Sequence, residues 1–327
     1  MTPAHTLNLI GVLSESKRII NTHSRHFLAL SLLFLLPLSC AIVSYPTLYP
    51  PTPQHDVVST QFHHPFTSPQ TLIFPLIYTL TTYLISLCAL ATITYSTFHG
   101  FYGRPVKLFP TIKSLLSSFF PLVSTALAGK FLLCLISLSF LMFVFVIVTL
   151  IQSLVFVFVI DYNSNSFIWF IAVIGLALFM ATLYFQIIWG LAPVIAVTES
   201  KWGFEPLWRS AYLINGMRSV SLSLMLVFGS LIGVWVWMGA RSVSGFTIVE
   251  DWRSWEFVLQ TVVCSGLLGF LVLLLLHYVA ANTVLYMYCK ALHGELAMEI
   301  AEEFAREYVC LPFDDDKVPH IVTVVSG

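Results

Sequence analysis

The sequence predicts an all-α, polytopic membrane helix bundle with six transmembrane helices and short cytosolic surface helices. Hydrophobic residues make up 58% of the 327-residue chain and charged residues only 9%, whereas a soluble domain carries about 25% charged residues. The apolar residues gather in six long runs, and a helix needs about 20 such residues to cross a bilayer. These observations exclude a soluble enzyme, a disordered regulator and a nucleic-acid-binding protein as descriptions of the whole chain.

The six apolar runs define the expected spans. They cover, approximately, residues 27–43, 72–94, 119–160, 167–197, 220–240 and 257–290. The third and sixth runs are longer than one perpendicular span requires, so we expect them to tilt or to continue as helix beyond the bilayer. The apolar core of the third run begins near Phe131.

The Lys and Arg residues set the expected orientation, since basic segments flanking the spans stay on the cytosolic side. Twelve of the fifteen lie in the N-terminal segment, the second and fourth loops and the C-terminal segment. Only Arg241 and Arg253 lie on the other side, and Lys130 falls within the third run. We therefore predict an integral, multi-pass protein with both termini cytosolic, in the endoplasmic reticulum or the plasma membrane.

The first run has an alternative interpretation as a cleavable signal peptide. Basic residues precede its apolar stretch, and Ser39, Cys40 and Ala41 supply small residues near a potential cleavage site. Cleavage would leave five spans and place the new N-terminus outside. We favour an uncleaved span because the apolar run continues to residue 43 and because the charge alternation already fits six spans.

Three segments make up the expected domain organisation. They are a cytosolic amphipathic N-terminal segment (1–26), the six-span membrane domain (27–292), and a cytosolic acidic helix with a tail (293–327). In the first segment, Leu9, Leu13 and Ile20 fall near one helical face. That pattern predicts either a helix lying in the membrane interface or one packed against the bundle.

Two further surface helices are expected on the cytosolic side. Pro206 suits the first position of a helix and Gly216 suits its end, which predicts a short helix over residues 206–214. Residues 293–310 combine a narrow apolar stripe with five Glu residues. Because an anionic leaflet repels an acidic helix, we expect this helix to dock on the basic cytosolic loops or on a cytosolic protein partner.

Polar and ionisable residues inside spans are the first candidates for a site. Lys130 and His277 are the ionisable ones, and Gln186 and Asn282 offer amides that can form hydrogen bonds between helices. Each of these side chains also has a structural interpretation, as a contact between helices or as a side chain that reaches the interface.

Glu199 ends the fourth run and requires a cation or a hydrogen-bond donor if it is partly desolvated. Arg209 is the favoured partner because a guanidinium binds a carboxylate through two parallel hydrogen bonds. Arg218 is the second choice, a local Glu205–Arg209 pair competes, and a solvated Glu199 is the remaining alternative.

Two stretches resemble known families. Residues 11–20 (GVLSESKRII) and 35–39 (LLPLS) resemble the first part of a group of plant multi-span proteins of unknown role. Residues 189–199 (WGLAPVIAVTE) and 207–218 (LWRSAYLINGMR) resemble the membrane domain found in glycerophosphoryl diester phosphodiesterases. The hydrolytic domain of those enzymes is a separate barrel for which this chain has no room. The resemblance implies a membrane module without phosphodiesterase chemistry, in a lipid-linked context.

No nucleophile elbow, zinc-protease motif or phosphate-binding loop occurs in the sequence, so we expect neither an enzyme nor a cofactor. The favoured function is a non-enzymatic scaffold, trafficking or partner-binding role, with membrane lipids as partners and no nucleic acid. The alternative is a lipid or small-solute transporter with a polar cleft around His277, Asn282 and Gln186. A membrane-embedded enzyme is the least favoured. A cavity lined by those residues would favour transport, and a dry core of Leu and Phe would favour a scaffold.

Overall fold

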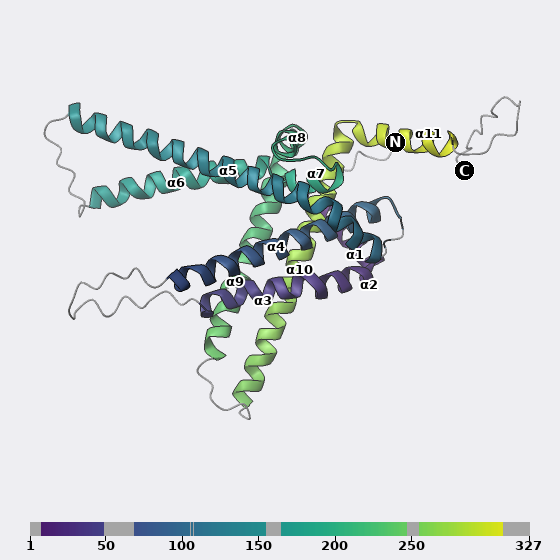
Figure 1. The fold of residues 1–327 in the computed structure, drawn as a ribbon, viewed down its shortest axis with the longest axis horizontal. Coiled ribbons are helices and arrows are strands. Elements are labelled where there is room, and N and C mark those ends of the chain that lie inside the picture. The colour runs from purple at the N-terminus through teal and green to yellow at the C-terminus, as the bar shows by residue number, and fades with distance from the viewer. Residues whose placement is uncertain are drawn as a thin grey trace, which may run out of the picture.

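The computed structural model describes residues 8–48, 69–104, 106, 108–154, 165–246 and 255–309. Every regular element in these ranges is a helix (Figure 1), as predicted. The elements are α1 (Leu9–Thr22), α2 (Ser24–Leu30), a π-helical turn η1 (Ser31–Leu35), α3 (Leu36–Leu48), α4 (Pro69–Phe101), α5 (Leu108–Leu154), α6 (Asn165–Ile188), α7 (Ala192–Thr198), α8 (Glu205–Leu213), α9 (Arg218–Phe246), α10 (Trp255–Leu292) and α11 (Glu295–Val309). The first seven residues and the predicted tail from residue 310 lie outside the described residues.

Six helical segments of the described chain are long and apolar enough to cross a membrane, which confirms the predicted number. They are Ser24–Tyr45, Ile73–Phe101, Leu108–Leu150, Trp169–Thr198, Arg218–Val243 and Val258–Leu292. The third begins earlier than predicted, because α5 continues through Pro121. Its 47 residues measure about 70 Å at 1.5 Å per residue, whereas the hydrocarbon core is about 30 Å thick. Part of α5 therefore extends beyond the bilayer.

The spans form three hairpins, α3–α4, α5–α6 and α9–α10, which diverge from a common base (Figure 1). The base consists of α1, α7, α8 and α11 together with the adjoining ends of α4, α5, α9 and α10. Helices α1 and α11 both lie there (Figure 1). The first and last described helices thus share one end of the molecule, as an even number of spans requires.

The hydrophobic core lies at the base and includes the N-terminal helix. Val12 and Ile19 of α1 are buried together with Phe27 of α2 and with Leu213 and Leu285 from α8 and α10. Helix α1 therefore packs against the bundle, the second of the two predicted alternatives. Each large apolar side chain that is removed from water here contributes about 1.5–3 kcal/mol.

The first span contains an irregular turn that has a local cause. Pro37 lacks the N–H that would bind the carbonyl of Leu33 four residues earlier, and its ring would clash with that carbonyl. The chain accommodates Pro37 by widening into the π-helical turn η1 directly before it. Leu35 and Leu38 on either side remain buried in the core.

Polar groups and small residues hold the helices of the spans together, as expected where lipid removes the hydrophobic drive between helices. The Tyr78 hydroxyl donates to the Ala41 carbonyl at 2.7 Å and links α4 to α3. Gly239 of α9 lies so close to α3 that an added Cβ would sit 3.1 Å from Val43. The outer part of the α5–α6 hairpin exposes large apolar side chains such as Phe143 and Val173, which provides a surface for lipid.

Two turns interrupt the helices of the apolar runs. The fourth span, Trp169–Thr198, consists of two helices, because α6 ends at Ile188 and α7 begins at Ala192. The sixth run does not continue directly into the acidic helix, because Gly294 adopts φ +75° and separates α10 from α11. The surface helix α8, by contrast, lies within one residue of its predicted bounds.

Candidate ligand cavity at the broken fourth span

The break in the fourth span follows from its sequence. Pro193 has no N–H to donate to the carbonyl of Trp189, so the helix cannot pass through this turn with its full set of hydrogen bonds. The Trp189 carbonyl instead accepts from the Ala192 N–H at 3.0 Å. Gly190 lies in the middle of the turn, and its surface is exposed.

Ser210 of α8 satisfies the backbone groups that the break leaves without helical partners. Its hydroxyl donates to the Ile188 carbonyl at 2.6 Å and accepts from the Leu191 N–H at 3.3 Å. The side chain is fully buried. Because a buried backbone group left without a partner costs about 1–3 kcal/mol, Ser210 stabilises the break and attaches α8 to it.

A cavity of about 410 Å³ lies beside the break, and all six spans contribute to its wall. This volume falls within the range of about 300–1,000 Å³ for small-molecule sites. The lining is mostly apolar with a few polar groups. It comprises Leu35, Leu38, Tyr83, Ser86, Leu87, Ala89, Leu90, Thr125, Ala126, Gly129, Lys130, Leu133, Gln186, Trp189, Gly190, Ala192, Pro193, Leu207, Ser221, Met225, Leu275, Tyr278, Val279 and Asn282.

The cavity brings two of the three predicted cleft residues together. Gln186 and Asn282 both line it, although they are separated by almost a hundred residues in the chain. His277 does not line it, so the predicted grouping was wrong for this residue. The His277 Nδ1 lies 2.8 Å from the Leu273 carbonyl of its own helix. Because an α-helix places residues five positions apart on different faces, His277 and Asn282 point in different directions.

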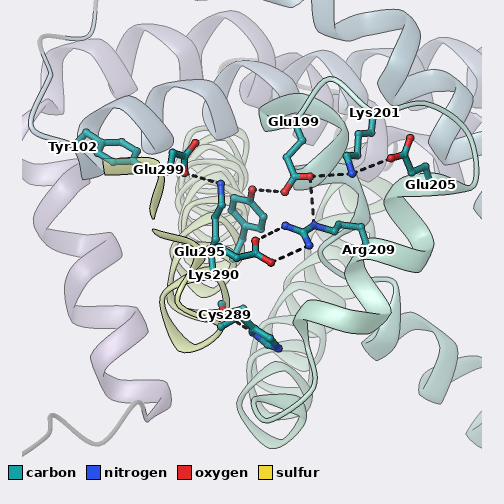
Figure 2. A network of polar contacts seen from close by, with 11 residues as sticks. Tyr102, Glu199, Lys201, Glu205, Arg209, Cys289, Lys290, Glu295 and Glu299 are labelled. Carbon is teal, nitrogen blue, oxygen red and sulfur yellow. Dashed lines mark hydrogen bonds and ion pairs between the residues drawn. The ribbon is translucent and has the colours of Figure 1, made fainter. Parts of the chain in front are cut away.

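A network of polar contacts joins the segment between α7 and α8 to α10 and α11 at the base (Figure 2). Arg209 is its centre. Its Nη1 donates to Glu295 Oε1 at 3.0 Å, and its Nη2 donates to Glu295 Oε2. Its Nε lies 3.5 Å from Glu199 Oε2, within ion-pair distance. The Tyr286 hydroxyl donates to Glu199 Oε1 at 2.9 Å.

The predicted Glu199–Arg209 contact therefore forms, with a correction to its geometry. The two-pronged contact of Arg209 is made with Glu295 and not with Glu199. Glu205 pairs with Lys201 at 2.9 Å rather than with Arg209, so the predicted local competitor is absent. Arg218 is exposed and forms no ion pair with Glu199 in the described part of the chain.

The acidic helix α11 binds the rest of the base through its first two turns (Figure 2). Glu295 contacts Arg209, and Glu299 accepts from Lys290 at 2.6 Å and from the Tyr102 hydroxyl at 3.3 Å. The expected docking of this helix on a basic segment thus occurs within the chain, through Arg209. Contacts from α7, α8 and α10 meet α11 in this one network.

Lys201 and Arg209 are the two cations of the network that lie outside the spans, and both are held in the charged state. The hydrogen bond to Glu205 raises the pKa of Lys201, against a smaller opposing effect of burial. Burial acts to lower the pKa of Arg209, but the carboxylates of Glu295 and Glu199 outweigh it and raise that pKa. A base with a raised pKa stabilises the fold fully below its ordinary pKa and loses that contribution as pH rises through the raised value. Around neutral pH these two contributions are therefore constant.

Three features of this region were not predicted from the sequence. The spacing of Gly190 and Pro193 inside an apolar run was a signal for a helix break. Ser210 carried no separate signal beyond its place in the stretch that resembles a membrane domain. The contacts of Glu295 and Tyr286 could not be predicted, because each residue binds a partner more than eighty residues away in the sequence.

The fold is that of a multi-pass α-helical membrane protein, with a cavity beside its broken fourth span. The chain matches a family described as a domain of unknown function, DUF8558, over residues 3–317, and it belongs to that family. No curated protein matches the chain, and no solved structure matches it. The resemblance to the phosphodiesterase membrane domain and the plant source stay predictions.

Proposed function

We propose that this protein binds a membrane lipid or a lipid-like amphiphile in the cavity at the broken fourth span. The observation that carries the proposal is the meeting of all six spans around this space, beside a helix break. Discontinuous spans often form the substrate sites of membrane carriers. Irregular backbone at membrane depth is tolerated where it lines a cavity or is buried in protein.

This arrangement favours the transporter alternative over the scaffold. A scaffold would require only a dry core, whereas Gln186, Asn282 and Lys130 meet here around a space for a ligand. The lipid-linked context implied by the sequence resemblance agrees with this choice. The reaction chemistry of an enzyme is not part of the proposal.

Native mass spectrometry of the purified protein tests whether a lipid occupies the cavity. Gly129 lines it, and an added Cβ would meet only Leu207 at 3.6 Å, so Gly129→Leu places its extra atoms in the cavity. The matched control is Gly175→Leu on α6, where an added Cβ meets nothing within 4 Å and the residue is not part of the lining. We expect the wild type and Gly175→Leu to retain one more lipid than Gly129→Leu. Equal retention by all three would contradict the proposal.

A flux measurement separates a carrier from a protein that only holds its lipid. Proteoliposomes are loaded with a fluorescently labelled phospholipid in one leaflet, and its appearance in the other leaflet is followed. We expect a protein-dependent rate that Gly129→Leu abolishes and Gly175→Leu preserves. Binding without any such rate would identify a lipid-binding protein that is not a carrier.

A cytosolic partner for residues 293–310 is a second proposal. The observation that favours it is the exposure of Ala297, Met298 and Ala301 on α11, with Met298 67% exposed. These residues lie beside the acidic ones that bind the base. Proximity labelling from the C-terminus should lose specific neighbours in Met298→Asp, which keeps Glu295 and Glu299. An unchanged labelling pattern would argue against this partner.

A further inference from the structure

We infer that Lys130 binds the anionic headgroup of a phospholipid whose acyl part occupies the cavity. The inference rests on the proposed lipid-binding function and adds the chemical class of the ligand. Lys130 lies on α5, lines the cavity and is exposed.

No carboxylate of the described residues pairs with the ammonium group of Lys130. In the described ranges, no hydrogen bond or ion pair involves this side chain. Three basic residues of the polar network, Lys201, Arg209 and Lys290, each form an ion pair with a carboxylate. Among the described residues, Lys130 thus combines the lack of a carboxylate partner with a place on the cavity wall.

The cavity wall favours an anion beside Lys130. None of the residues that line it is Asp or Glu, so an anionic group entering the space meets no fixed negative charge there. Charge interactions strengthen as the local dielectric falls, and this wall is mostly apolar. Gln186, whose side chain forms no hydrogen bond to another described residue, adds an amide donor on the same wall.

The same wall selects a lipid rather than a free phosphate. Leu, Ala, Val and Met side chains from several spans cover most of it, and they match acyl chains. Trp189, Tyr83 and Tyr278 add amphipathic rings of the kind that gather at the level of lipid headgroups. A phospholipid offers one charged group for Lys130 and an apolar part for the rest of the cavity.

The competing interpretation is that Lys130 only extends its ammonium to the interface, as lysines near span ends do. Under that interpretation, the lipid retained in the cavity shows no preference for an anionic over a zwitterionic headgroup. The two accounts therefore differ in a quantity that can be measured, which is the ratio of anionic to zwitterionic lipid retained by the protein.

The experiment uses the full chain in nanodiscs made of equal amounts of phosphatidylcholine and phosphatidylglycerol with identical acyl chains. Lipid retained after extraction is identified by native mass spectrometry. We expect the wild type to enrich phosphatidylglycerol about fivefold, the preference that one lysine near a membrane surface supplies. Lys130→Gln should retain one lipid without preference, and Lys130→Arg should keep the preference. Lys113→Gln is the control, because Lys113 is exposed on the same helix but does not line the cavity.

The outcomes separate this inference from the proposed function. Lipid retention that is independent of headgroup in the wild type, or an unchanged preference in Lys130→Gln, would overturn the role of Lys130 and leave lipid binding intact. Retention that Gly129→Leu and a second cavity-filling variant, Met225→Trp, fail to reduce would overturn lipid binding itself. Displacement of the lipid by inorganic phosphate would show that the cavity recognises the phosphate alone and would contradict the lipid assignment.

Discussion

At the scale of single residues, two neighbours in α8 attach this helix to the bundle in different ways. Ser210 points inward and binds the backbone on both sides of the break. Arg209 forms ion pairs with Glu295 and Glu199. The sequence indicated the Glu199–Arg209 contact because a carboxylate at the end of an apolar run requires a cation. It could not indicate Glu295, which reaches Arg209 only through the turn at Gly294.

Ser210→Ala removes the group that satisfies Ile188 and Leu191. We expect a loss of about 1–3 kcal/mol, the cost of leaving a buried backbone group without a partner, seen as a lower melting temperature of the solubilised protein. Ser223→Ala is the control, since its hydroxyl donates to the Ser219 carbonyl of its own helix. Equal melting temperatures for the two variants would contradict the role of Ser210.

Arg209 and Glu295 should be energetically coupled. In a double-mutant cycle with Arg209→Gln and Glu295→Gln, we expect a coupling of about 1 kcal/mol, because the two side chains are partly exposed and solvent weakens the pair. The control cycle combines Arg209→Gln with Glu205→Gln. Glu205 binds Lys201 and is 61% exposed, so its effect should add to that of Arg209. Strict additivity in both cycles would rule out the pairing with α11.

At the scale of elements, local sequence signals predicted the bounds of α8 closely but did not lead to a prediction of the break in the fourth span. Pro206 and Gly216 bound α8 closely because both act through local backbone geometry. Hydropathy located the fourth span but not the break, since α6, the turn and α7 are all apolar. Gly190 and Pro193 are a local signal for a break, but the hydroxyl of Ser210 that stabilises it comes from another helix, and no local pattern contains that contact.

Gly216 should be required for the connection between α8 and α9. Its φ is +102°, and an added Cβ would lie 3.0 Å from Leu292 Cδ2. We expect Gly216→Ala to lower the free energy of unfolding by about 1–3 kcal/mol. Gly229→Ala in α9 is the matched control, because an added Cβ there meets nothing within 4 Å. A melting temperature for Gly216→Ala equal to that of the control would show that the left-handed backbone is not required.

At the scale of the whole molecule, composition and charge predicted the number of spans, but the cavity could not be predicted. Side chains from all six spans meet to form it. Gln186 and Asn282 were selected as polar residues in apolar runs, and both line it. His277 met the same criterion and does not, because the helical face that a residue occupies depends on how the hairpins pack.

Both termini should lie on the cytosolic side of the membrane. The asymmetry of Lys and Arg residues motivates this prediction, and the position of α1 and α11 at one end of the molecule agrees with it. In sealed microsomes, we expect external protease to remove tags from both ends of the chain. Protection of both tags would contradict the orientation, and protection of the C-terminal tag alone would contradict the even number of spans.

The central claim is that a lipid occupies the space beside the broken fourth span, and mapping its position tests this claim most directly. A phospholipid with a photoactivatable acyl chain is incorporated with the full chain into nanodiscs, and cross-linked peptides are identified by mass spectrometry. We predict saturable cross-links on the cavity-lining segments around Gly129 and around Gly190, which excess unlabelled lipid removes. Cross-links confined to the exposed outer parts of α5 and α6, with none at the cavity, would contradict it.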